Sequence, residues 1–136
     1  MTVLGDPLYA DTSALVKLII NENESESLAR YVSESDLQLT SSVIAEVELL
    51  RAVKRVERGR LDEAQQLLDE MILVPVSTDI KHRAVNIGPE SLGRSDAIHL
   101  ATAIEIQADL RGFVSYDNRL IDSARGAGIG ATSPVG

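Results

Sequence analysis

The stretch "PLYADTSALVKLII", residues 7–20, joins a short apolar strand to a helix through a single aspartate. "PLYA" has the length and composition of a buried strand, and Asp11 is a natural N-cap for the helix that follows. The same alternation continues along the chain. It predicts further strands at 37–40, 72–76, 112–116 and 129–132, and helices at 22–35, 41–59, 61–71, 78–88, 95–106 and 117–128. Strands that alternate with helices predict an α/β domain with a central, mostly parallel sheet flanked by helices on both faces. Pro75 suggests that the 72–76 strand lies at an edge.

The size and composition suit one soluble domain spanning residues 1–136. The chain has no cysteine, which excludes disulfides and thiolate metal sites. A net charge of −8 and a pI near 4.7 argue against a general basic surface for nucleic acid, so any such contact must be local. No run is long and apolar enough to span a membrane, and the amino end lacks the basic region of a signal peptide. We therefore expect a cytoplasmic protein.

Four acidic residues occupy unusual positions. Asp11 and Asp117 directly follow predicted strands, at the sheet edge where α/β folds bind ligands. Asp96 begins an apolar helix and shares its face with Leu100 and Ala103. Glu46 lies in the apolar stripe of the 41–59 helix, beside Val43, Leu49, Leu50 and Val53. A helix cap would explain Asp96 alone, but convergence in one acidic pocket explains all four.

Carboxylates gathered in one pocket repel one another unless a cation neutralises them. Mg²⁺ or Mn²⁺ prefers oxygen ligands of this kind and suits the attack of water on a phosphodiester. A zinc hydrolase fits less well, because His82 and His99 are the only histidines and their spacing does not suit a ligand pair. His99 is interpreted as a hydrogen-bonded core residue. Glu48 and Glu57 are expected to be solvent-exposed helix formers.

Four segments, in this order, carry a resemblance to a known family: "YADTSALVKL", "SSVIAEVELLRA", "DAIHLATA" and "FVSYDNRL". They resemble the PIN-domain ribonucleases, and most closely the VapC toxins of toxin–antitoxin pairs. The resemblance implies a PIN-like fold, Mg²⁺-dependent RNA cleavage with transfer RNA as the first candidate, a homodimer, and inhibition by a cognate antitoxin. It places the acidic site on Asp11, Glu46, Asp96 and Asp117, with Asp11 and Asp96 as the main metal ligands. It also places Ser115 near the metal.

Basic residues contribute a further expectation about partners. Arg51, Arg55 and Arg58 share one helix face, which is either a solvated surface or a phosphate contact. The role of Arg94 stays open. The acidic pocket is an electrostatic target for an antitoxin with a basic tail, since an Arg or Lys could replace the charge of the metal.

Two other functions remain as alternatives. A metal-dependent phosphatase with a nucleophilic aspartate needs a second aspartate two residues later, where this chain has Ser13. The other is a catalytically inactive PIN-like module that only binds RNA or protein. The presence of all four acids counts against it.

Overall fold

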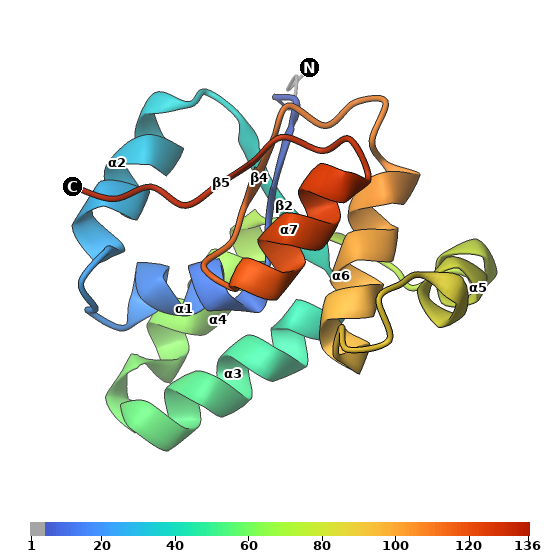
Figure 1. The fold of residues 1–136 in the computed structure, drawn as a ribbon. Helices are drawn as coiled ribbons and strands as arrows, with labels where there is room; N and C mark the ends of the chain where they lie inside the picture. The colour runs from blue at the N-terminus through green and yellow to red at the C-terminus, as the bar shows by residue number, and fades with distance from the viewer. Residues whose placement is uncertain (1–4) are drawn as a thin grey trace, which may run out of the picture.

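The computed structural model describes residues 5–136 and has a five-stranded parallel sheet at its centre (Figure 1). The strands are β1 (Pro7–Ala10), β2 (Gln38–Ser42), β3 (Ile72–Val74), β4 (Gly112–Val114) and β5 (Ala131–Thr132), in the spatial order β3-β2-β1-β4-β5. The helices are α1 (Thr12–Ile19), α2 (Ser25–Glu34), α3 (Ile44–Val56), α4 (Leu61–Glu70), α5 (Thr78–Asn86), α6 (Arg94–Glu105) and α7 (Asn118–Gly126). The predicted parallel α/β architecture is confirmed.

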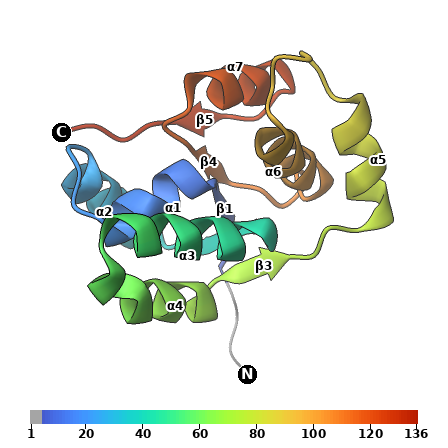
Figure 2. The same ribbon diagram turned by 90° about the horizontal axis from the view of Figure 1, so that it is seen from below.

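The two-residue period of the strands separates two cores. Leu8 and Ala10 point to the face covered by helices α1 to α4, whereas Tyr9 between them points to the face covered by α6 and α7. On β4, Val114 and Phe113 divide in the same way. Helix α5 packs against α6, outside the second core (Figure 2). The sheet is therefore buried on both faces, as expected for parallel strands.

Some element boundaries differ from the sequence prediction. Ser41 and Ser42 extend β2, because Ser42 pairs with Val74 of the neighbouring strand, and α3 begins only at Ile44. Helix α3 ends at Val56, and Gly59 lies in a short 3₁₀ helix, η1 (Arg58–Arg60), instead of ending the long helix. The edge position of β3, just before Pro75, is confirmed.

The topology brings several helix N-termini to one end of the sheet. The first turns of α1, α3, α6 and α7 lie together at the carboxyl ends of the strands (Figure 1). Asp11 caps α1 and Asp117 caps α7. Along residues 5–136, no helix combines the length and the apolar character needed to cross a membrane.

Candidate functional site

Asp11 is buried at the junction of β1 and α1. Its Oδ1 accepts hydrogen bonds from Ser13 Oγ at 2.7 Å and from the Ala14 backbone N–H at 3.1 Å, and its Oδ2 accepts one from Ser115 Oγ at 2.7 Å. Burial raises the pKa of the Asp11 carboxyl, although these three hydrogen bonds act in the opposite direction. Only 3% of Asp11 is exposed, so its orientation is held firmly by its neighbours.

Two serines connect Asp11 to the loop between β4 and α7 through hydrogen bonds. Ser115 Oγ, which donates to Asp11, also accepts from the backbone N–H of Asp117 at 3.0 Å. Ser13 Oγ likewise accepts from the backbone N–H of Tyr116 at 3.0 Å. Asp117 Oδ1 in turn caps α7 by accepting from the backbone N–H groups of Arg119 and Leu120. The structure thus connects Asp11, Ser115 and Asp117, which the sequence analysis named.

Asp96 lies in the first turn of α6, close to the other two aspartates. Partial burial, followed by the charges of Asp117 and Asp11, raises its pKa from 3.8 to about 6. The N-cap position of α6 is held by Gly93, so a capping role does not explain why Asp96 is there. The carboxyl group of Asp96 is therefore close enough to two carboxylates from other elements for their charges to act on it.

The acidic residue of α3 that faces this region is Glu48, and the expectation that it would be solvent-exposed was wrong. Glu48 Oε1 accepts a hydrogen bond from Thr12 Oγ1 at 2.6 Å and lies 3.0 Å from His99 Nε2. Partial burial acts to raise its pKa, but hydrogen bonds from His99, Thr12 and Ser95 outweigh burial and lower it to about 2. Thr12 follows Asp11 and Ser95 precedes Asp96, so Glu48 lies between the neighbours of two site aspartates.

The sequence analysis placed Glu46 at the site, whereas the glutamate of α3 that contacts the neighbours of Asp11 and Asp96 is Glu48. Residues that are two positions apart on an α-helix differ by about 200° in direction, so the side chains of Glu46 and Glu48 leave α3 on different sides. Among the hydrogen bonds and ion pairs found within residues 5–136, none involves the side chain of Glu46. A signal for Glu48 was present in the sequence: Ala45 and Ala52, three residues before and four after it, leave room for close packing.

A hydrogen-bonded chain leads from Glu48 into the core. Tyr9 Oη accepts from the Ser42 backbone N–H at 3.1 Å and lies 2.6 Å from His99 Nδ1. The Glu48 carboxylate can only accept, so the ring proton between the two side chains is on His99 Nε2. In that tautomer Nδ1 is an acceptor, and the Tyr9 hydroxyl donates to it. Tyr9 and His99 are almost completely buried. The prediction that His99 is a hydrogen-bonded core residue is confirmed, and its partners connect it to the site.

The chemistry of the donor set fits a hard divalent cation. Asp11, Asp96, Asp117 and Glu48 offer only oxygen ligands. Burial first, and then the negative charge of Asp117 and Asp11, raises the pKa of Asp96, and a bound cation would neutralise that charge. Within residues 5–136, no three His, Cys, Asp or Glu side chains already stand at ligating distances from a common point.

The predicted basic cluster lies apart from these acids. Arg51 and Arg55 are exposed on the later turns of α3, and Arg58 is exposed in η1. The N-terminal end of α3, by contrast, lies next to α6 (Figures 1 and 2). Arg94 is the first residue of α6, exposed and two positions before Asp96. A phosphate contact near the acids is therefore better placed at Arg94 than at the α3 cluster.

Comparisons with known proteins identify the family of this chain. The model of the PIN domain family matches residues 8–126. Ribonuclease VapC47 of Mycobacterium tuberculosis (strain CDC 1551 / Oshkosh) is 38% identical over 131 residues, which cover 93% of this chain and 96% of that protein. Ribonuclease VapC46 of Mycobacterium tuberculosis (strain ATCC 25618 / H37Rv) is 33% identical, with coverage of 93% and 97%.

Solved structures share the fold at lower sequence identity. Mycobacterium tuberculosis VapC20, described as a sarcin–ricin loop cleaving toxin, superposes with a TM-score of 0.74 at 15% identity, covering 93% of this chain and 99% of that one. VapBC2 from Rickettsia felis, bound to a DNA fragment from its promoter, gives a TM-score of 0.68 at 14% identity, with coverage of 94% and 98%. At these identities, the likeness concerns the fold alone.

Proposed function

Since this chain belongs to the PIN-domain family and, within it, to the VapC ribonucleases, we propose that it is a metal-dependent endoribonuclease and the toxin of a toxin–antitoxin pair. The observation that carries the proposal is that Asp96 lies close enough to Asp117 and Asp11, at the carboxyl edge of the sheet, for their charges to act on its carboxyl group. Carboxylates this close together repel one another, which costs free energy unless a bound cation neutralises their charge.

Mg²⁺ is the proposed cofactor, and Mn²⁺ could replace it. Asp11 and Asp96 are the main ligands, Asp117 completes the set, and Glu48 takes the place predicted for Glu46. When bound, the ion polarises the scissile phosphate and lowers the pKa of the attacking water. Ser115 and Ser13 hold the Asp11 carboxylate in a fixed orientation. Glu48, oriented by Thr12 and His99, is placed to orient the water or accept its proton.

The proposed partners follow from charge and from the relatives. The substrate is RNA, with transfer RNA as the first candidate and ribosomal RNA as the second, because one structural neighbour is described as cleaving the sarcin–ricin loop. The natural inhibitor is an antitoxin with a basic tail. Other structural neighbours are toxin–antitoxin complexes. A homodimer is the proposed assembly.

The test is cleavage of purified RNA by the purified chain. We expect cutting with Mg²⁺, no cutting after chelation, and products that carry 5′-phosphate and 3′-hydroxyl ends, because water and not the ribose 2′-hydroxyl is the nucleophile. Mass spectrometry of short products identifies the ends. Cleavage that persists in the chelator, or products with cyclic phosphate ends, would refute the proposed mechanism.

A further inference from the structure

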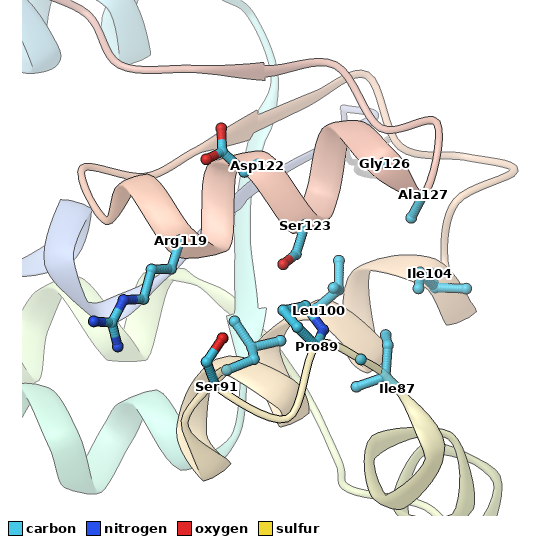
Figure 3. Close-up of a pocket in the computed structure, with 12 residues that line it drawn as sticks. Ile87, Pro89, Ser91, Leu100, Ile104, Arg119, Asp122, Ser123, Gly126 and Ala127 are labelled. Atoms are coloured by element: carbon cyan, nitrogen blue, oxygen red, sulfur yellow. The ribbon is translucent and has the colours of Figure 1, made fainter.

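A groove of about 620 Å³ lies between α6 and α7, beside the proposed site (Figure 3). One wall is α6, with Leu100 and Ile104, and the opposite wall is α7, with Arg119 and Ser123. Leu92, in the segment that follows α5, also lines it. This volume falls within the range of pockets that hold small organic ligands.

Most of the groove lining is apolar, and Ser91 and Ser123 add two hydroxyl groups. Leu92 and Leu100 are buried, and Ile104 packs against the same core. Ser123 points its hydroxyl into the groove (Figure 3), and the neighbouring Asp122 is also among the lining residues. A flat ring with polar edges could place its faces against the leucines and isoleucine and an edge against Ser123.

One end of the groove opens towards the acids. Arg119 and Leu100 come earlier along their helices than Ala127 and Ile104, so the end near Arg119 lies towards Asp96 and Asp117. Arg119 is exposed, two residues after Asp117, and takes part in none of the ion pairs found among residues 5–136. The Arg119 guanidinium thus lies at the end of the groove that is nearer to the proposed scissile phosphate. The apolar part of the groove continues from that end.

We propose that this groove binds a nucleobase of the RNA substrate, on a nucleotide next to the scissile phosphate, and that Arg119 contacts a neighbouring phosphate. The proposal rests on the proposed ribonuclease function. Single-stranded bases are commonly held between apolar or aromatic side chains, with hydrogen bonds to their edges. A guanidinium pairs well with phosphate, and a chain of net charge −8 needs such local cations to hold a polyanion.

The experiment compares cut-site preference among variants. Short single-stranded RNAs with randomised sequence are cleaved, and the ends are sequenced. Wild type should prefer certain bases at one position beside the cut. Ser123→Leu, which fills the groove, should reduce that preference about five- to tenfold, in line with the energy of holding one base. Ser123→Ala, which removes only the hydroxyl, should shift it less. Arg125→Gln, on the same helix but outside the groove lining, is the matched control and should keep the wild-type profile.

Two further measurements do not depend on filling the groove. Arg119→Gln should raise KM for all sequences and reduce the dependence of binding on log salt by roughly one phosphate contact. Wild type should cut an RNA with an abasic nucleotide at the preferred position about five- to tenfold less efficiently. This arm remains informative even if Ser123→Leu fails to fold.

The outcomes separate this proposal from the proposed function. If wild type cuts no RNA with Mg²⁺, the ribonuclease function fails, and the nucleobase site fails with it. If wild type cuts RNA but Ser123→Leu, Arg119→Gln and the abasic substrate all behave like their parents, only the nucleobase site is overturned. A Ser123→Leu variant with an unchanged RNA profile and weakened antitoxin binding would assign the groove to the protein partner and also overturn the proposal.

Discussion

His99 Nε2 lies 3.0 Å from Glu48 Oε1, which joins α6 to α3 across 51 positions of sequence. The same carboxylate oxygen accepts from Thr12, the residue after Asp11. Glu48 is therefore oriented from two directions, by the helix that carries Asp96 and by the helix that Asp11 caps. Mutation of a residue that orients a metal-binding carboxylate commonly lowers metal affinity or activity by about 10- to 100-fold.

Glu48→Gln should reduce RNA cleavage by more than about tenfold, whereas Glu46→Gln should stay near the wild-type rate. The two variants form a matched pair, because both change one glutamate of the same helix to its neutral isostere. Rates at several Mg²⁺ concentrations, with circular dichroism as a folding control, measure the effect. The reverse ranking would return the role to Glu46.

Asp11→Asn and Asp96→Asn should each lower the cleavage rate by more than about a hundredfold while the protein stays folded. The reason is loss of ligand charge. Without metal, both variants should unfold at the same temperature as wild type or slightly higher, because burial already disfavours the ionised acids. Thermal melts in chelator and single-turnover cleavage provide the measurements. A wild-type rate in either variant contradicts the site.

The stability of the metal-free protein should fall as the pH rises from about 4 to about 6. Asp96 titrates near 3.8 when unfolded and near 6 in the fold, so between these values the folded state binds more protons. Its contribution to stability is complete below the lower pKa and is lost as the pH passes the higher one. Urea unfolding at several pH values measures this. Mg²⁺ should reduce the loss at high pH, and Asp96→Asn should show a weaker pH dependence.

Tyr9→Phe should lower the free energy of unfolding by about 1–3 kcal/mol, because it leaves the Ser42 N–H and His99 Nδ1 without their buried partner. The ring itself, stacked on Phe113, is retained. Urea unfolding of the two proteins measures the difference.

His99→Gln, which can still accept from Tyr9 and donate to Glu48, should keep more cleavage activity than His99→Leu. Equal activity of the two His99 variants would show that the hydrogen bond to Glu48 does not matter.

Antitoxin binding should weaken as the Mg²⁺ concentration rises. A basic side chain of the antitoxin that enters the acidic site would compete with the metal, since an arginine can pair with two carboxylate oxygens. Calorimetry with the proposed antitoxin, at several Mg²⁺ concentrations, measures the competition. Asp11→Asn should bind the antitoxin less tightly. An affinity that is independent of Mg²⁺ and unchanged in Asp11→Asn would place the basic tail elsewhere.

Features that depend on neighbouring residues were predictable from the sequence. The local periodicity of apolar residues indicated alternating strands and helices. From it the five strands and a mostly parallel sheet were predicted, and the structure contains both. Asp11 and Asp117 could be placed at the carboxyl edge of the sheet because each follows a strand, Asp11 directly and Asp117 after two intervening residues, and caps the next helix. Parallel strands bring such positions to a common edge wherever they lie in the chain.

Features that depend on packing between distant segments required the tertiary structure. Glu46 and Glu48 both flank the buried side of α3, and only the positions of α1 and α6 determine that Glu48 meets Thr12 and His99. The partner of His99 in the core, Tyr9, is 90 residues away. Periodicity identifies which face of a helix is buried, but it does not identify the neighbouring element. For this reason the sequence could bring the three aspartates to one region of the fold, while the contacts of Glu48 and the groove beside Arg119 became visible only in the tertiary structure.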